Sequence, residues 1–286
     1  MSAPTRFTEL VACAWPVQLA AMAGGVGGPV LAAAVQEVGG LGMVSWGEEI
    51  PPGCGINFIV AYRPSAEVVR EAAGRARVVE FFYDDPDREL VDAAHGPGAI
   101  AGWQVGSVNE AVAAEAVGCD YVVAQGTEAG GHVRGRSSLD DLLPAVLARV
   151  TVPVVAAGGI ATAERVAALL GTGADGVRVG TRFLTCPESG AHDQYVQSLL
   201  AASSEDTALT EWFDEGWPHA PHRVLAGALE AAKHSGWRGV GPPHRAVDRN
   251  PADMAQYAGT GVGDVTAVEP AAEVVADLVR LLPGTV

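Results

Sequence analysis

The alternation of short apolar runs with helical segments constrains the fold of this 286-residue chain more than any other feature of its sequence. Each run is rich in Val, Ile or aromatic residues, is closed by Gly or Pro, and precedes an Ala-, Glu- and Leu-rich stretch, as expected for a buried strand followed by a helix. Eight such runs predict strands at Val17–Met22, Leu41–Ser45, Ile56–Val60, Val78–Tyr83, Ile100–Val105, Tyr121–Gln125, Val154–Ala157 and Val177–Phe183. Helices are predicted at Pro29–Val38, Ser65–Ala73, Asp87–Ala94, Val108–Val117, Leu139–Arg149 and Thr162–Gly171, and the connection after the second strand is too short for one.

Strands that are apolar on both faces and joined by helices indicate a parallel sheet. Eight strand–helix steps predict that this sheet closes into an α/β fold of the (β/α)8 TIM-barrel type. The alternative is an open doubly wound sheet, which usually carries a G-x-G-x-x-G turn after its first strand. Gly25-Val26-Gly27 follows the first strand, but Val30 stands where the third glycine is required. The sequence therefore favours the barrel.

The alternation stops after Phe183, and helical segments dominate the rest of the chain. They are predicted at Glu188–Ala202, His222–Lys233, Asp253–Ala258 and Ala271–Leu282, around a Gly-, Pro- and His-rich loop at Ser235–Arg249. We expect residues 1–286 to form one domain, in which residues 188–286 are a largely helical C-terminal addition that covers the barrel mouth.

The charge balance excludes two classes of partner. The chain has 18 Lys and Arg against 34 Asp and Glu, a net charge of −16 that repels phosphate backbones and anionic lipid surfaces. We therefore expect neither nucleic acid nor a membrane as a partner. Four widely spaced cysteines without a C-x-x-C pair indicate reduced thiols. With no secretory signal pattern at the N-terminus, the expectation is a cytoplasmic protein, and the sequence is compatible with a homo-oligomer.

Glycines follow the predicted seventh strand and lie within the predicted eighth, and TIM barrels commonly bind phosphate at the loops after these two strands. Gly158 and Gly159 close the seventh strand, and Gly180 precedes Thr181 in the eighth. Glycine allows backbone N–H groups to approach phosphate oxygens closely, and a threonine hydroxyl can donate to the same group. The alternative is that the first pair only makes a tight turn. The occurrence of both features on the two expected strands favours a phosphate site.

The loop after the sixth strand, Gln125–His132, ends in two glycines and a histidine. His132 is the candidate catalytic residue, because imidazole is readily tuned for proton transfer and this loop belongs to the active face of a barrel. Glu128 could orient the loop through backbone N–H groups. Glu188 and His192 stand four apart on a predicted helix, but no further ligand joins them. His219 and His222 indicate a lid or a surface loop, and no metal is predicted.

With these motifs in place, the chain resembles the nitronate monooxygenases, formerly called 2-nitropropane dioxygenases, which are FMN-binding barrels. The loop Gln125–His132 is the most distinctive part of the resemblance, and the glycine pairs are common to many phosphate-binding barrels. The resemblance as a whole covers Pro16–Gly25, Gly39–Gly42, Gly55–Val60, Gly118–His132, Pro153–Ile160, Gly173–Leu184, Glu188–Tyr195 and, more weakly, Tyr257–Leu282.

The resemblance implies roles for individual residues. His132 matches the active-site histidine of the family, and Asn57 matches an asparagine that hydrogen-bonds FMN. The other residues implied to contact the flavin or its phosphate are Met22, Ala23, Gly24, Gln125, Gly130, Gly158, Gly159, Gly180 and Thr181. Three positions depart from the family pattern: Ala21 stands where Pro is usual, Arg178 where Gln is usual, and Gln104 where some relatives carry a flavin-contacting Lys. A cation at Arg178 could stabilise an anionic reduced ring or a substrate carboxylate.

The implied activity is the FMN-dependent oxidation of alkyl nitronates or nitroalkanes by dioxygen to a carbonyl compound and nitrite. The small-molecule substrate and dioxygen are then the expected partners. An FMN-dependent enoyl-ACP reductase using NADH or NADPH is the alternative, since it shares the Glu-Ala-Gly-Gly-His loop and the Val-Gly-Thr-Arg-Phe strand. A flavin-free sugar-phosphate barrel and a non-catalytic flavin carrier are further readings.

Overall fold

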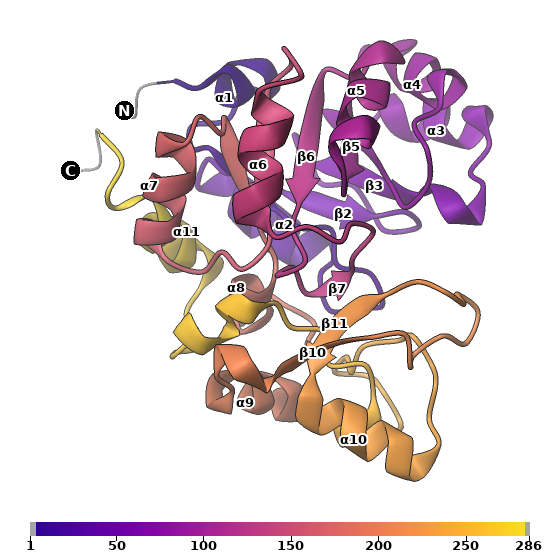
Figure 1. Ribbon diagram of the computed structural model, residues 1–286, viewed down its shortest axis with the longest axis vertical. Helices are drawn as coiled ribbons and strands as arrows, with labels where there is room; N and C mark the ends of the chain where they lie inside the picture. The colour runs from indigo at the N-terminus through magenta and orange to yellow at the C-terminus, as the bar shows by residue number, and fades with distance from the viewer. Residues whose placement is uncertain (1–3, 284–286) are drawn as a thin grey trace.

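The computed structural model of the protein describes residues 4–283 and contains the predicted parallel barrel (Figure 1). Its eight strands run in the spatial order β1-β9-β8-β6-β5-β4-β3-β2, and every neighbouring pair is parallel. The strands are β1 (Val17–Leu19), β2 (Met43–Ser45), β3 (Gly55–Ile59), β4 (Val78–Phe82), β5 (Ile100–Val105), β6 (Tyr121–Gln125), β8 (Val154–Ala157) and β9 (Gly176–Val179). The predicted fold class is confirmed.

A parallel bridge between Gln18 and Leu41 closes the ring. The amide of Leu19 donates to the carbonyl of Leu41 at 2.9 Å, and the amide of Leu41 donates to the carbonyl of Val17 at 2.9 Å. Because the first strand also pairs with β9, the barrel has no free edge that would leave backbone groups unpaired. The predicted absence of a helix between β2 and β3 is also confirmed.

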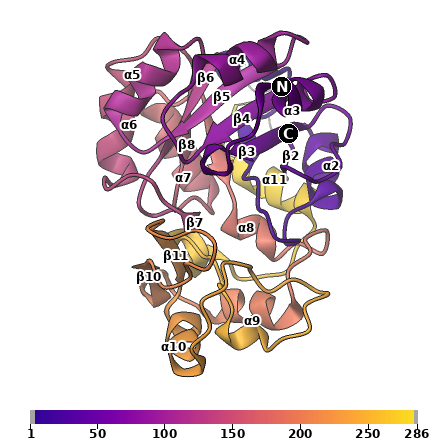
Figure 2. The ribbon, with the colours of Figure 1, turned by 90° about the vertical axis from the view of Figure 1, so that its right-hand side faces the viewer.

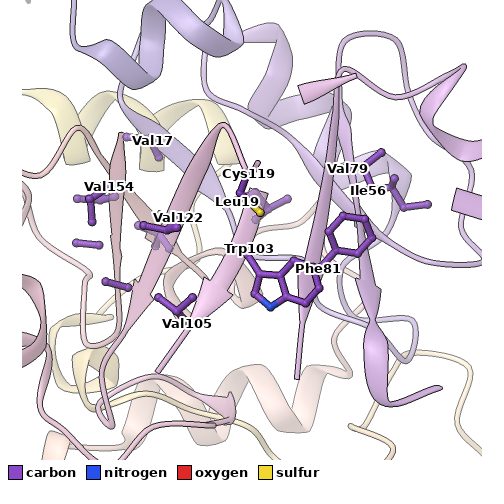
Figure 3. Close-up of a cluster of buried hydrophobic side chains, with 14 of the residues drawn as sticks. Val17, Leu19, Ile56, Val79, Phe81, Trp103, Val105, Cys119, Val122 and Val154 are labelled. Atoms are coloured by element: carbon purple, nitrogen blue, oxygen red, sulfur yellow. The ribbon is translucent and has the colours of Figure 1, made fainter. Parts of the chain in front are cut away.

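Outward-facing side chains of the strands form the larger core, between the barrel and its helices (Figure 3). Phe58, Phe81 and Trp103 occupy successive positions across β3, β4 and β5. Their ring centroids are 6.2 Å apart for the first pair and 4.9 Å for the second. Such offset aromatic contacts add stability beyond the burial of apolar area.

Inward-facing side chains fill the amino-terminal end of the barrel. Phe7 and Val11, from the N-terminal helix α1 (Arg6–Val11), pack against Met43 and Tyr121. Tyr121 crosses the interior above Gly102, where a Cβ atom would lie 2.3 Å from the tyrosine ring. Glycine at this position therefore makes room for a ring at the barrel axis.

Helices cover the outside of the barrel, and the last one returns to it from the far end of the chain. The helix α11 packs against both α7 and α2, so it completes the outer layer between the last and first strand–helix units. The barrel helices are α2 (Pro29–Glu37), α3 (Ala66–Ala73), α4 (Arg88–His95), α5 (Val108–Ala116), α6 (Leu139–Leu147), α7 (Ala163–Gly171), α8 (Thr181–Leu184) and α11 (Ala271–Val279), with the 3-10 turn η1 (Val60–Tyr62) after β3. Ser107 and Thr162 cap α5 and α7 with their hydroxyl groups, as their positions in the sequence indicate.

Residues 193–264 form a cap over the carboxyl ends of the strands, and Figure 2 shows it as a separate layer below the barrel. The cap contains a small antiparallel sheet of order β10-β11-β7, in which β7 comes from the loop after β6. Its elements are β7 (Gly131–His132), β10 (Thr207–Thr210), β11 (His222–Leu225), α9 (Asp193–Ala201), α10 (Ala226–Ser235) and the 3-10 turns η2 (Ser204–Asp206), η3 (Pro251–Asp253) and η4 (Thr260–Asp264).

Several predicted element boundaries are wrong. The eighth strand ends at Val179, and Thr181–Leu184 is the short helix α8, because β1 is only three residues long and offers no further pairing partner. The helix predicted at His222–Lys233 begins only at Ala226, since its first four residues pair with β10. No helix forms at the predicted Asp253–Ala258, where only Asp253 belongs to a helical turn, the end of η3, and the helix predicted from Glu188 begins at Asp193 as α9. None of the helices within residues 4–283 is long and apolar enough to cross a membrane.

The contact between Gly102 and Tyr121 gives a test of the barrel interior. We expect Gly102→Ala to lower the free energy of unfolding by about 1–3 kcal/mol, because a Cβ atom would overlap the buried ring. Gly171→Ala is the matched control, since its Cβ atom would meet nothing within 4 Å at the end of α7, and we expect a change of about 1 kcal/mol at most. Urea denaturation measures both. Equal stability of the two variants would contradict this packing.

Candidate functional site

A cavity of about 320 Å³ lies at the carboxyl ends of the strands, between the barrel and the cap. Its size is within the range of small-molecule and cofactor sites. The structure brings every residue predicted for the site to its lining: Met22, Ala23, Gly24, Asn57, Gln104, Gln125, Gly130, His132, Gly158, Gly159, Arg178, Gly180 and Thr181. Arg178 is the only Lys or Arg, and no carboxylate is present, among the described residues of the lining.

The floor of the cavity is polar and rests on a buried ion pair. Asn57, Gln104 and Arg178 line the cavity, while Glu80, Gln18 and Tyr121 lie beneath them inside the barrel. Glu80 is fully buried and pairs with the guanidinium of Arg178. Because a buried carboxylate is costly without partners, its further hydrogen bonds to Asn57, Tyr121 and Gln18 are what make this position tenable. Glu80 is not among the residues predicted for the site, although a single charged residue inside an apolar strand is a recognisable signal.

One end of the cavity is lined by close-packed glycine backbone. Gly158 and Gly159 have φ values of 122° and 66°, which residues other than glycine rarely adopt. A Cβ atom on Gly159 would lie 2.9 Å from the hydroxyl of Thr260 in the cap. Gly158 and Gly159 therefore make the tight turn that was the alternative to a phosphate site, and the same two residues also line the cavity.

Thr181 joins this end of the cavity to the cap. Its hydroxyl oxygen accepts a hydrogen bond from the amide of Gly259 at 3.0 Å, which leaves the hydroxyl hydrogen available to a ligand. Thr181 is the first residue of α8, where backbone N–H groups have no partner within the helix. This end of the cavity thus suits an anionic group.

The loop that carries His132 is fixed at both ends. The carboxylate of Glu128 accepts from the amide of Leu139 at 2.9 Å and so holds the loop to the start of α6, in agreement with the orienting role considered for it. The amide group of Gln125 donates to the carbonyl of His132 at 3.0 Å. At the far end, β7 pairs with β11, and His132 faces His222 across that pair.

The imidazole of His132 lies in an aromatic cluster. It stacks on Trp217 with ring centroids 3.8 Å apart, and Tyr83, His222 and Tyr257 surround it at 5.1–5.9 Å. Burial, together with the smaller effect of the neighbouring His222, lowers the pKa of His132 to about 3. His132 is therefore neutral at physiological pH.

Two buried polar atoms at the site have no hydrogen-bond partner within the described structure. They are Nε2 of His132 and Oε1 of Gln125, and both residues line the cavity. Buried polar atoms are normally satisfied, so an unpartnered pair beside a cavity indicates that a ligand supplies the partners. Together with the glycine-lined end and the polar floor, these two atoms are compatible with a bound flavin, the class of cofactor that the sequence resemblance implies.

The first loop of the barrel also meets the cap at the cavity. Gly24 has a φ of 77°, and a Cβ atom there would lie 2.6 Å from the ring of Pro242. Any side chain at this position would push the cap away from Met22 and Ala23, which line the same wall. The close approach of loop and cap therefore requires glycine.

The interpretation of the other histidines needs correction. His222 is fully buried next to His132, so the predicted surface loop is wrong at this residue. Glu188 and His192 do not share a helix: Glu188 accepts from the amide of Ala271, and His192 caps α9. The residues between 4 and 283 contain no group of three or more metal-ligating side chains.

Four aromatic residues surround the site and are not among the residues predicted for it from the sequence. Trp217, Tyr62 and Tyr257 line the cavity, and Tyr83 contacts both His132 and Trp217. Tyr83 has a φ of 72°, which is uncommon for a bulky residue and accompanies its contact with the active-site cluster. Of the four, only Tyr257 lies in a segment with weak resemblance to the family. The local sequence around Tyr62, Tyr83 and Trp217 does not distinguish them from aromatic residues that only pack.

Comparison with known proteins relates the chain to one enzyme family. The family model for nitronate monooxygenase matches residues 53–280. The first curated relative is the (3aS,4S,5R,7aS)-5-hydroxy-7a-methyl-1-oxo-octahydro-1H-indene-4-carboxyl-CoA dehydrogenase of Rhodococcus jostii, with 33% identity over 81% of this chain and 69% of that protein. The matches to curated nitronate monooxygenases span between 32% and 42% of those proteins' length, with 41% for that of Pseudomonas aeruginosa.

Two solved structures match nearly the whole chain. FabK from Thermotoga maritima has a TM-score of 0.80 and 27% identity, and the match covers 98% of this chain and 96% of that one. Nitroalkane oxidase from Streptomyces ansochromogenes has a TM-score of 0.78 and 28% identity, with 98% and 99% covered. Because these matches cover 98% of this chain, they include the cap as well as the barrel.

The low pKa of His132 predicts a specific pH dependence of stability. The unfolded chain binds a proton at this imidazole near pH 6.5, whereas the folded protein does so only near pH 3. Between these values the unfolded state holds more protons, so stability falls as the pH drops. Wild-type stability should fall by about 3 kcal/mol between pH 7.5 and pH 4.5 on account of this imidazole alone, and we expect His132→Gln to lack this part of the fall.

Urea denaturation at the two pH values measures this difference. His234→Gln is the matched control, because His234 is exposed on α10 and lies outside the cavity. The same slope for His132→Gln and the wild type would contradict a neutral, buried His132.

Proposed function

Because the chain belongs to the nitronate monooxygenase family, we propose that it is an FMN-dependent oxidoreductase that converts alkyl nitronates or nitroalkanes and dioxygen to a carbonyl compound and nitrite. The observation that carries the proposal is that a single cavity combines a glycine-lined end, a polar floor and an unpartnered, neutral imidazole. The similarity to nitroalkane oxidase over nearly the whole chain supports this choice of reaction.

The glycine-lined end and the floor divide the binding of FMN between them. Gly158, Gly159, Gly180 and Thr181 would hold the phosphate through backbone N–H groups and one hydroxyl. Asn57, Gln104 and Arg178 would meet the polar edge of the flavin ring. When bound, FMN supplies the electron transfer to dioxygen, and the protein supplies binding, orientation and local electrostatics.

His132 would bind the nitro group of the substrate. A neutral imidazole can donate a hydrogen bond from one ring nitrogen to an oxygen of a nitronate, which arrives already deprotonated. For a neutral nitroalkane, Nε2 of His132 would accept the α-proton. Because its pKa is about 3, this imidazole is a weak base, so the nitronate is the better substrate in this proposal.

The aromatic cluster would exclude water from the reacting centre. Trp217 covers one face of His132, and Tyr62 and Tyr83 pack against the indole ring at 5.3 and 4.8 Å. A site closed in this way strengthens hydrogen bonds to the nitro group and limits side reactions of reduced flavin with solvent.

Enoyl-ACP reduction is the second candidate, and the equally close superposition on FabK is the observation that favours it. That reaction requires a nicotinamide nucleotide to reduce the flavin. The Rhodococcus relative acts, by its name, on a CoA thioester. In this chain the only cation of the described cavity lining, Arg178, is already paired with Glu80, so the lining offers no free cation to the phosphates of CoA or of a nucleotide.

The electron donor distinguishes the two candidates. We expect the purified protein to show the visible spectrum of bound FMN and to be reduced, under anaerobic conditions, by propionate 3-nitronate but only slowly by NADH or NADPH. Stopped-flow absorbance at the flavin band measures each rate. Rapid reduction by a nicotinamide nucleotide together with no reaction with the nitronate would overturn the proposal in favour of the reductase.

The role of His132 is tested by comparing two forms of one substrate. We expect His132→Asn to reduce kcat/KM at least about tenfold more for a neutral nitroalkane than for its nitronate, because only the nitroalkane needs a proton acceptor. Oxygen consumption measures both reactions, and His234→Asn on exposed α10 is the control. Equal losses on the two substrates would count against His132 as the base.

A further inference from the structure

We propose that Glu80 is a positioning residue that neutralises Arg178 and fixes the orientation of the Asn57 and Gln104 amides, and that it thereby sets the reduction potential of the bound flavin. This inference rests on the proposed binding of FMN and deepens it. Glu80 does not line the cavity, so it acts only through residues that do.

The ion pair spans the barrel. In the ring of strands, β4 and β9 lie on opposite sides, and Glu80 and Arg178 reach across the interior to meet. Gln18 lies beside the pair: its Oε1 accepts from Nε of Arg178 at 3.3 Å, and its Nε2 donates to Glu80 at 3.2 Å. Tyr121 donates to Glu80 at 2.8 Å, and burial raises the pKa of this phenol, so it stays a donor.

The charges in this network determine which way each amide points. A guanidinium only donates, so the atom of Gln104 that meets Nη1 of Arg178 must be its oxygen. A carboxylate only accepts, so the atom of Asn57 that lies 3.1 Å from Glu80 must be its nitrogen. The atoms left for the cavity are therefore the NH2 group of Gln104 and the carbonyl oxygen of Asn57.

This pattern complements the polar edge of a flavin. The pyrimidine part of the isoalloxazine ring has one N–H donor flanked by two carbonyl acceptors. A fixed acceptor at Asn57 and a fixed donor at Gln104 match that alternation, whereas an amide free to turn over would match it only part of the time. Glu80 thus preorganises two residues that line the cavity, although it does not itself contact the ligand.

The pair also controls the charge under the ring. Reduction of a flavin adds negative charge, which an uncompensated guanidinium nearby would stabilise and which would raise the reduction potential. Glu80 offsets that charge, so the pair acts on the flavin as a dipole, whose field falls off faster than that of a single charge. The floor of this site is therefore close to electrically neutral although it contains an arginine.

A cycle of variants in the FMN-bound protein tests the inference. We expect Glu80→Gln to raise the midpoint potential of the flavin, Arg178→Gln to lower it, and the double variant to return close to the wild type. Equilibrium reduction against a reference dye measures the potential. We also expect Glu80→Gln to weaken FMN binding at least about tenfold, because Gln can accept as well as donate and no longer fixes Asn57.

Asp175→Asn is the matched control. Asp175 is a buried carboxylate paired with an arginine, Arg6, but it lies at the amino-terminal end of the barrel, away from the cavity. We expect this variant to lose stability without a change in potential. If Glu80→Gln does not fold, the double variant must still have a higher potential than Arg178→Gln, because it lacks the buried negative charge.

The inference would be overturned if the flavin of Glu80→Gln had the same midpoint potential as that of the wild type. It would also be overturned if the double variant had the same potential as Arg178→Gln. In either case Glu80 would be a structural residue. A wild-type protein that binds no FMN when mixed with it would overturn the proposed function as well. The two failures are therefore distinguishable before any activity is measured.

Discussion

Closure of the barrel by the bridge between Gln18 and Leu41 is the constraint on which the rest of the structure depends. In an open sheet, β4 and β9 would stand four strands apart, and neither of their charged side chains could reach the other. Closure brings them to a common axis and gives each buried polar group its partners. It also gathers the carboxyl ends of the strands around one cavity, so the site depends on the same closure as the fold.

The sequence predicts the parts of this molecule that follow from local pattern. Apolar runs of fixed length indicate the strands, and Gly158, Gly159 and His132 are recognisable because their positions at strand ends are known once the barrel is. Every residue named for the site from the sequence lines the cavity, although the role of each one stays a proposal. Closure of the barrel also supports the position-based argument for a phosphate site at the last two strands.

What the sequence does not predict depends on partners that are distant in the chain. In the sequence Glu80 is an isolated charge, because its partner Arg178 is 98 residues away and only the fold brings the two together. The helix-forming residues that follow His222–Leu225 dominate the sequence pattern there, and this segment is a strand because it pairs with both β10 and β7. Trp217 lies in an irregular segment, and its stacking on His132 depends on where the cap folds back. Tertiary contacts decide all three cases.

The return of α11 to the barrel has a consequence for how the cap can evolve and move. Since the chain leaves the barrel after α8 and rejoins it at α11, the cap is an insertion with both of its ends anchored on one rigid body. Anchoring at two points limits the conformations open to it, so closing over a ligand costs less entropy than docking a free tail would. The same arrangement lets the cap change in sequence and length, and with it the substrate accepted, while the strands that carry the floor stay as they are.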